Sequence, residues 1–332
     1  MKFLIAGAGA IGAYLGACMA RAGFDVTLFA RGPHLKAMQD HGVRVKGPEG
    51  DFEAHPKIVG SLEEAERADV VFLGVKAHSL PQLAPHLKPV LGPDTTVVST
   101  QNGIPWWFFQ GFGGEWEGLR LERIDPDGVI SAAIEPRRII GSIVYFSTEV
   151  ASPGVIQYIS GNRISIGELD GSRSDRCRTI AEALVASGLR CPITTHIREE
   201  ICVKILGNAS LNPLSALTRA TIAQMLRDPG VSQIVRNIMK EVEAVAHKLG
   251  MELSVSIDQR IAGAEKVGEH KTSMLQDLEA GRPMELEALV GSVVELGERV
   301  GVPMPYTGTV YNCTQLLAQR AAAASSGLRE AN

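Results

Sequence analysis

The chain has 332 residues, of which 45% are hydrophobic and 21% charged, and its formal net charge is −4. This length is enough for two domains, and the composition is ordinary for a globular protein. A weakly acidic balance gives no reason to expect nucleic acid or an anionic membrane as a partner.

The N-terminal segment and the cysteines indicate the compartment. Residues 1–23 carry no basic start followed by a cleavable apolar core, so we expect neither a signal peptide nor a membrane span. The five cysteines are scattered and show no metal-ligand spacing, which favours free thiols in a reducing environment. We therefore expect a cytoplasmic protein without a metal site.

The first half alternates short β-branched runs with helical patterns. Strands are predicted at 2–7, 24–30, 68–76 and 95–100, and a helix at 10–23. The runs ADVVFLGVK and TTVVST are almost continuously apolar, as in strands buried on both faces of a parallel sheet. Strands that alternate with helices predict right-handed crossovers and a doubly wound sheet.

The later elements predict where the chain divides. A polar hairpin is expected from 43–47 and 52–59, and a second hairpin around Gly161-Asn162. A helix follows at 175–188 and a last strand at 189–195, and beyond His196 the pattern is helical throughout. We predict an α/β Rossmann-type domain at 1–195 and an all-α domain at 196–332.

The segment GAGAIG (7–12) is a G-x-G-x-x-G motif that follows a strand and opens a helix. Gly7 would permit a tight turn, Gly9 the approach of a diphosphate, and Gly12 close packing of helix on strand. A diphosphate would sit at the helix N-terminus, where unpaired N–H groups and the dipole favour anions. The predicted contacts are Gly7, Ala8, Gly9, Ala10, Ile11 and Gly12.

Three later residues extend this predicted cofactor site. The second strand ends in LFARG, with no acid for a ribose 2′-OH but with Arg31, which suits a 2′-phosphate. NADPH is therefore favoured over NADH, a solvated surface arginine being the alternative. Lys76 would contact a cofactor ribose or the substrate, and Asn102 the nicotinamide side. A surface lysine and a turn asparagine explain these two residues equally well.

The helical half contains a polar stripe. Lys204, Asn208 and Asn212 are spaced i, i+4, i+8, along about 12 Å of one side of a helix. A lysine and two amides among apolar neighbours are costly to bury without partners, and lysine suits proton donation. An ordinary amphipathic helix is the alternative. Pro213 should kink or end this helix at Asn212.

Two further candidates, Ser273 and Glu285, lie in HKTSMLQDLEAGRPMELEALVG (270–291). By local rules Pro283 is the first residue of a helix and Glu285 a capping acid at its third position. Spacing alone therefore does not make Glu285 catalytic.

Taken together, these stretches resemble the ketopantoate reductase (2-dehydropantoate 2-reductase) family. The resemblance rests on GAGAIG, on AR at 30–31, VK at 75–76 and QNG at 101–103, on KILGNASLNPLSAL at 204–217, and on SML at 273–275 with Glu285. It implies a Rossmann domain joined to a helical domain like that of 6-phosphogluconate dehydrogenases. It also implies reduction of a 2-oxo acid by NADPH, with ketopantoate as the default substrate in pantothenate biosynthesis.

The resemblance also implies roles for single residues. Lys204 would be the general acid, Asn208 and Asn212 would orient the substrate, and Ser273 would bind its carboxylate. Glu285 would contact substrate or cofactor and help to position Lys204. By the same resemblance, the NADPH ligands include Arg31, Lys76 and Asn102.

The chain departs from the family pattern at Ile222, where some members carry a polar side chain, and after QNG. Residues 101–116, QNGIPWWFFQGFGGEW, hold all three tryptophans, and more than thirty residues separate STQNGIP from RRIIGSIV. So long a connection predicts a functional loop. One hypothesis is an aromatic lid or wall over the reacting carbon of the substrate, which would favour a substrate bulkier or more apolar than ketopantoate. The alternative is an aromatic patch at a subunit interface.

Two other functions stay open. A related dehydrogenase would act on a 3-hydroxy acid or an imine, and a non-catalytic module would bind NADPH as a sensor. The oligomeric state is open as well, a homodimer included.

Overall fold

The protein is described here by a computed structural model that covers residues 1–330 and forms two compact units. Ala331 and Asn332, the end of the predicted helical domain, lie outside the described residues. The first unit comprises Met1–Asn102, Trp106–Arg120 and Asp125–Ile197. The second comprises Gly103–Pro105, Leu121–Ile124 and the chain from Arg198 onward, so it includes two short pieces of the connection after QNG.

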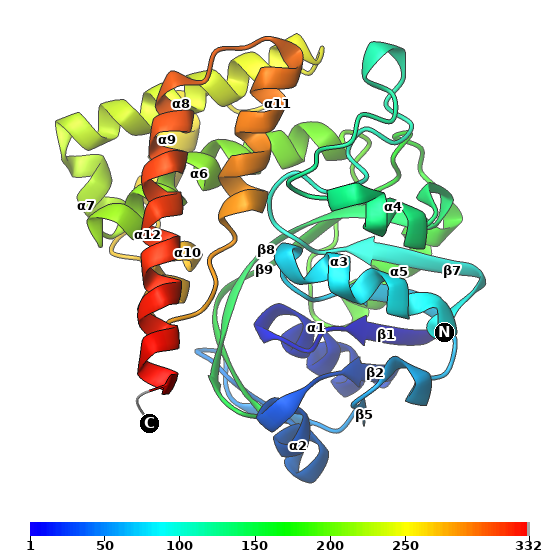
Figure 1. Cartoon of the computed structure of the whole chain (residues 1–332). Coiled ribbons are helices and arrows are strands. Elements are labelled where there is room, and N and C mark those ends of the chain that lie inside the picture. The colour runs from blue at the N-terminus through cyan, green and yellow to red at the C-terminus, as the bar shows by residue number, and fades with distance from the viewer. Residues whose placement is uncertain (331–332) are drawn as a thin grey trace. The chain divides into compact units, whose positions relative to one another are not determined.

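A nine-stranded sheet is the frame of the first unit, in the order β4-β3-β9-β8-β7-β6-β1-β2-β5 (Figure 1). The strands are β1 Lys2–Ala6, β2 Asp25–Phe29, β3 Val43–Lys46, β4 Phe52–Ala54, β5 Lys57–Val59, β6 Ala68–Leu73, β7 Leu91–Ser99, β8 Ile139–Ser152 and β9 Val155–Gly167. The neighbours from β5 to β8 all pair in parallel. The predicted α/β Rossmann-type sheet is confirmed.

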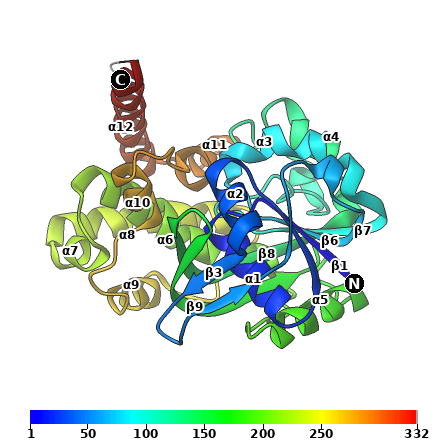
Figure 2. The same ribbon diagram turned by 90° about the horizontal axis from the view of Figure 1, so that it is seen from below.

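Helices cover both faces of this sheet. They are α1 Ala10–Arg21, α2 Gly32–His41, α3 Leu80–Leu83, α4 Val129–Ala133 and α5 Asp175–Ala186, with 3-10 turns η1 Leu62–Glu64, η2 Ala77–Ser79, η3 Ala84–Val90, η4 Gly114–Trp116, η5 Pro126–Gly128 and η6 Pro136–Arg138. Helices α1 and α5 contact each other. Figure 2 shows α3 and α4 on the side of the strands opposite α5.

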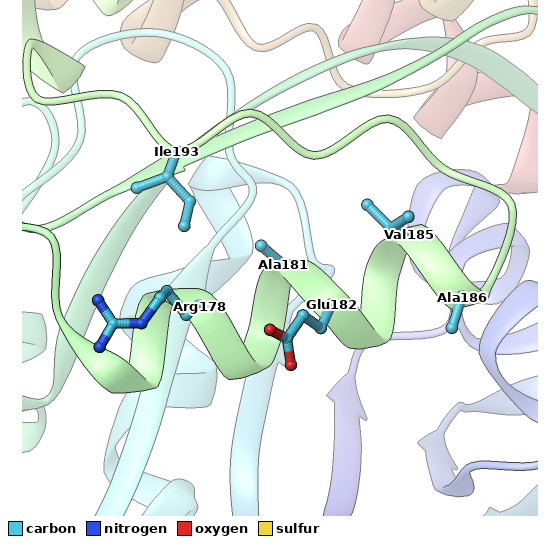
Figure 3. A pocket seen from close by; sticks show the side chains of 6 residues that line it. All are labelled: Arg178, Ala181, Glu182, Val185, Ala186 and Ile193. Atoms are coloured by element: carbon cyan, nitrogen blue, oxygen red, sulfur yellow. The ribbon is translucent and has the colours of Figure 1, made fainter.

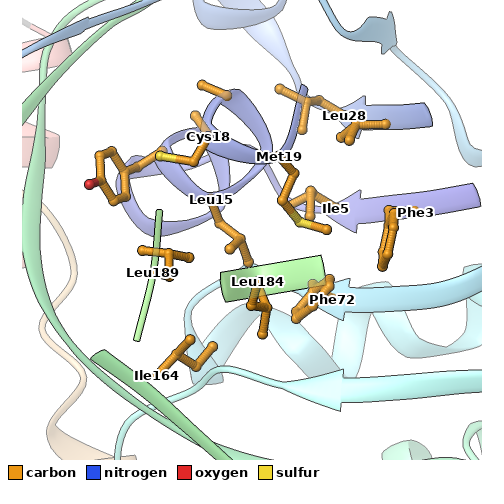
Figure 4. Packing of buried hydrophobic residues seen from close by; sticks show 14 of the residues in the cluster. Phe3, Ile5, Leu15, Cys18, Met19, Leu28, Phe72, Ile164, Leu184 and Leu189 are labelled. Carbon is orange, nitrogen blue, oxygen red and sulfur yellow. The ribbon is translucent and has the colours of Figure 1, made fainter. Parts of the chain in front are cut away.

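The central strands β1 and β6 are mostly apolar, and both of their faces are buried. Phe3 and Ile5 of β1 point into a cluster with Leu15 of α1 and Leu184 of α5 (Figure 4). Leu4, which lies between them and faces the other way, is only 1% exposed. The nearly continuous apolar runs in the sequence therefore indicated the right environment.

The hairpin predicted around Gly161-Asn162 was wrong. Strand β9 runs through this dipeptide and pairs antiparallel with β8, and the chain reverses at Pro153-Gly154 instead. The register shifts between Tyr145, which pairs with Arg163, and Ser147, which pairs with Ser160. Two residues of β9 thus face one of β8, and Gly161 takes φ +78°. The glycine signals a bulge, not a turn.

Two other strand predictions hold only in part. Strands β3 and β4 form the expected antiparallel hairpin, but the chain after Pro56 leaves it as β5 and pairs parallel with β2. The run at 189–195 forms isolated bridges through Arg190 and Ile193 instead of a strand.

The second unit is helical, as predicted. Its elements are α6 Ile197–Thr218, α7 Ile222–Arg227, α8 Pro229–Lys248, α9 Ile257–Glu265, α10 Ser273–Glu279, the π-helical turn η7 Glu287–Gly291, α11 Ser292–Val300 and α12 Pro305–Glu330. Helix α8 contacts α7, α9, α11 and α12. Among the described residues, no helix combines the length and the apolar character needed to cross a membrane.

Of the two outcomes predicted for Pro213, the end of the helix was wrong, and the kink stays a prediction. Helix α6 continues past it to Thr218. Proline removes one backbone hydrogen bond from a helix. Leu211, Asn212, Leu214 and Ala216 around it are all buried, and this tertiary packing stabilises the helix through the proline.

Candidate active site

The loop between β1 and α1 makes the close approaches that a dinucleotide fold needs. Gly7 has φ +115°, and a Cβ there would lie 2.7 Å from the backbone nitrogen of Val75. A Cβ on Gly12 would lie 2.1 Å from the carbonyl oxygen of Gly7. Side chains at these two positions would push α1 away from the sheet, so both glycines set the packing of this loop.

Gly9 instead faces open space. It is exposed, and the nearest neighbour of a Cβ there would be the Gly74 carbonyl oxygen at 3.9 Å. Gly9 is the N-cap of α1 without a side-chain cap, and the first turn, which contains Ala10 and Ile11, has no acidic residue. Ala8 N–H donates to the Phe29 carbonyl at 2.8 Å and ties the loop to β2. The arrangement leaves an exposed, electropositive helix start that fits a diphosphate.

Arg31 stands at the end of β2, as the N-cap of α2, and is exposed. Its Cζ lies 6.0 Å from the centroid of the Phe29 ring. Strands β1 and β2 pair in parallel, with Ala6 opposite Phe29. The guanidinium therefore belongs to the sheet edge that carries the glycine loop.

Lys76 and Asn102 follow β6 and β7 at the same edge, because these strands run parallel to β1. Both residues are half-buried, and Lys76 is the N-cap of η2. Gln101 joins the two strand ends, since its Nε2 donates to the carbonyls of Leu73 at 2.7 Å and Val75 at 2.9 Å. Sequence reasoning missed this positioning role of Gln101, although the QNG motif contains it.

The polar stripe of α6 lies in a buried helix. Asn212 is 7% exposed, and Lys204 and Asn208 are half-buried. Between them, a Cβ on Gly207 would lie 2.0 Å from Nη2 of Arg260 in α9. The glycine therefore lets a guanidinium lie against α6 within one turn of Lys204. Arg260 was not among the predicted site residues, and the signal was the glycine inside the stripe.

Ser273 and Glu285 lie at helix starts. Ser273 is the exposed first residue of α10, which Thr272 caps by accepting from the N–H of Leu275 at 3.3 Å. Glu285 is half-buried, and its carbonyl accepts from the N–H of Leu289 at 3.1 Å. Because the helix begins at Leu286, the predicted helical positions of Pro283 and Glu285 were wrong.

The aromatic segment belongs largely to the core. Its four buried rings are Trp106, Trp107, Phe108 and Phe109, whereas Phe112 and Trp116 are half-buried. Trp107 Nε1 donates to Ser99 Oγ at 2.7 Å, and a Cβ on Gly141 would lie 2.6 Å from the ring. Rings packed in this way form neither an exposed lid nor an exposed interface patch, so these two forms of the hypotheses were wrong for them. A wall of the substrate pocket stays a prediction.

A shallow hollow of about 400 Å³ lies elsewhere, along α5 (Figure 3). Its lining residues are Arg178, Ala181, Glu182, Val185, Ala186 and Ile193. The hollow contains none of the predicted site residues, and its floor is mainly apolar. We therefore do not assign the active site to it.

Comparison with known proteins gives the family. The description "Ketopantoate reductase PanE/ApbA" matches residues 3–112, and "Ketopantoate reductase PanE/ApbA C terminal" matches residues 196–318. A 2-dehydropantoate 2-reductase of Mesorhizobium japonicum is 47% identical over 96% of this chain and 98% of its own length.

Two solved structures support the same family. A protein of Ralstonia solanacearum MolK2 that was assigned as a ketopantoate reductase is 38% identical, with a TM-score of 0.92 over 96% of this chain and 98% of its own. The 2-dehydropantoate 2-reductase of Methylococcus capsulatus is 30% identical, with a TM-score of 0.82 over 97% and 98%. On these matches, the chain belongs to the ketopantoate reductase family.

Proposed function

We propose that this protein reduces a 2-oxo acid to a 2-hydroxy acid with NADPH, and that ketopantoate is the first substrate to test. The observation that carries the proposal is the row of Lys204, Asn208 and Asn212 on a largely buried helix. The 47% identical relative named 2-dehydropantoate 2-reductase supports ketopantoate as the first substrate to test.

The first unit would hold the dinucleotide. The loop Gly7–Gly12 offers backbone N–H groups to the diphosphate, and Lys76 and Asn102 would bind the ribose and the nicotinamide side. Arg31 would bind a 2′-phosphate, because the end of β2 offers a guanidinium and no carboxylate to a ribose hydroxyl. When bound, the nicotinamide dinucleotide supplies the hydride.

The second unit would supply the proton. Reduction of a ketone builds negative charge on its oxygen, and a positioned ammonium both stabilises that charge and protonates the oxygen. Lys204 would be this acid. Asn208 and Asn212 would hydrogen-bond the substrate, Ser273 would bind its carboxylate, and Glu285 would contact the substrate or cofactor and help to position Lys204.

The primary experiment follows NADPH absorbance with ketopantoate, smaller 2-oxo acids and a bulkier aromatic one. We expect Lys204→Ala to lower kcat by about 10²- to 10⁴-fold, the usual contribution of a general acid, with little change in the Kd of NADPH. The control is Lys248→Ala, which removes an exposed lysine from α8. Equal turnover in Lys204→Ala and the control would remove Lys204 from this role.

A second experiment compares NADPH with NADH. Loss of a charge-assisted hydrogen bond predicts that Arg31→Ala weakens NADPH binding by about 10- to 100-fold and leaves NADH binding nearly unchanged. Lys36→Ala is the control, because it removes an exposed cation from the same helix. If the wild-type protein binds both cofactors equally well, the 2′-phosphate role is refuted.

The same assays separate the other candidate functions. Turnover of 3-hydroxy acids or cyclic imines without turnover of 2-oxo acids would make the protein a related dehydrogenase. NADPH binding without turnover of any substrate would indicate a sensor module.

A further inference from the structure

Two pieces of the connection between β7 and β8 pack on one turn of the helical unit. Gly103 has φ +91°, and a Cβ there would lie 2.0 Å from the carbonyl oxygen of Ala288 in η7. Only glycine permits so close an approach of the backbone to the π-helical turn. Leu121–Ile124 form the second piece.

The second piece is held through its backbone. The carboxylate of Glu295 in α11 accepts from the N–H of Glu122 at 2.9 Å and from the N–H of Arg123 at 3.1 Å. Glu295 is only 8% exposed, and Nη2 of Arg299 lies 3.7 Å from it. A buried carboxylate with two backbone donors fixes the path of this segment on the helix.

The side chain of Arg123 then reaches the turn itself. Its Nη1 donates to Glu287 Oε2 at 2.8 Å and to the hydroxyl of Tyr311, and its Cζ lies 4.9 Å from the centroid of the Tyr311 ring. Tyr311 donates to the other oxygen of Glu287 at 2.8 Å and accepts from Gln315 Nε2 at 2.8 Å. Each carboxylate oxygen of Glu287 therefore accepts a hydrogen bond.

Gly291, the last residue of η7, provides the space for this cluster. A Cβ there would lie 2.5 Å from Glu287 Oε2, 3.0 Å from the Tyr311 ring and 3.1 Å from Cδ of Arg123. Burial, together with the Glu287 carboxylate, raises the pKa of Tyr311 to about 12. The phenol therefore keeps its proton at neutral pH and can donate it to Glu287.

The held turn follows directly after Glu285. The π-helical turn begins two residues after Glu285, whose carbonyl accepts from the N–H of Leu289 within it. Single π-helical turns inside helices occur frequently at functional sites. Two contacts therefore hold the backbone just after Glu285. Gly103 packs against Ala288, and Arg123 donates to Glu287.

We propose that Arg123 is a positioning residue for Glu285, because its contacts with Glu287 and Tyr311 hold the π-helical turn to which the Glu285 backbone is bonded. The inference rests on the proposed function, in which Glu285 acts in the reductase site. It adds to that site a residue that enters from the long connection between β7 and β8.

The test compares Arg123→Met, Arg123→Lys and Tyr311→Phe with Arg227→Met. Arg227 forms an exposed ion pair with Glu269 and serves as the matched control. A catalytic group displaced by about 1 Å costs up to about 100-fold in rate, so we expect Arg123→Met to lower kcat by about 10- to 100-fold. The Kd of NADPH should stay unchanged, and Arg123→Lys should recover part of the loss.

A double-mutant cycle with Glu285→Gln separates positioning from general stabilisation. If Arg123 acts through Glu285, Arg123→Met causes little further loss of kcat once Glu285 has become glutamine. If the loss of kcat in the double variant equals the product of the losses in the two single variants, the proposal is overturned.

Hydrogen exchange of the amides of 286–291 gives a readout independent of turnover. We expect faster exchange in Arg123→Met than in Arg227→Met, and equal exchange would refute the positioning role even in an active enzyme. If the wild-type protein reduces no 2-oxo acid, the proposed function fails, and the exchange result alone decides whether Arg123 holds the turn.

Discussion

Trp107 offers the most direct test of whether the aromatic segment belongs to the hydrophobic core. Its side chain is 0% exposed, its Nε1 donates to the buried Ser99, and its ring fills the space over Gly141. Replacing a fully buried large aromatic residue by alanine costs about 3–5 kcal/mol, of which a net hydrogen bond accounts for about 1 kcal/mol. At about 2–4 °C per kcal/mol for a unit of this size, Trp107→Ala should lower Tm by roughly 6–20 °C.

The assay is thermal unfolding followed by circular dichroism. Trp116→Ala is the control from the same segment, because this ring is only half-buried and should cost about 1 kcal/mol. Trp107→Phe removes the hydrogen bond to the Ser99 hydroxyl together with part of the ring volume, so a double-mutant cycle with Ser99→Ala is needed to isolate the hydrogen bond. That variant should lose less stability when Ser99 is also replaced by alanine.

A lid would give the opposite pattern. If Trp107→Ala lowers Tm no more than Trp116→Ala does, but raises the KM of a 2-oxo acid severalfold, the ring covers substrate and the core assignment is refuted.

Two further predictions concern the glycine loop and a histidine. Gly12→Ala should lower both Tm and NADPH affinity, because its Cβ would meet a backbone carbonyl at 2.1 Å. Gly9→Ala should weaken NADPH binding while Tm stays the same, since Gly9 faces open space. If Gly9→Ala lowers Tm as much as Gly12→Ala does, the assignment of a binding role to Gly9 and a packing role to Gly12 is contradicted. His34 Nδ1 accepts from the N–H of Gly154 at 2.9 Å, and burial lowers the pKa of His34 from its ordinary 6.5. Its contribution to stability is complete above pH 6.5 and is lost as pH falls through the depressed pKa. In urea titrations, the wild-type protein should therefore lose more stability between pH 8 and pH 5 than His34→Gln, and equal losses would contradict this assignment.

Local signals predicted most of the first unit. The glycine spacing of 7–12, the apolar runs of β1, β6 and β7, and the helical pattern after His196 each depend on residues close in sequence. Strand polarity follows from alternation with helices, so the edge that carries Arg31, Lys76 and Asn102 was also predictable.

The errors arose where a local signal has two structural outcomes. A glycine pair suits a turn or a bulge, and the long pairing of β8 with β9 selected the bulge at Gly161. A proline can end a helix or lie within one. At Pro213 the helix continues, because the neighbouring residues are buried.

The sequence by itself determined the parallel strands, the glycine loop at 7–12 and the polar stripe of α6, because these follow from periodicity and spacing within a few residues. Only the tertiary structure placed Trp107 in the core and joined Glu122 to Glu295 across 173 positions. Burial and pairing at such separations depend on which surfaces meet when the whole chain packs, and no local pattern of residue types encodes that choice.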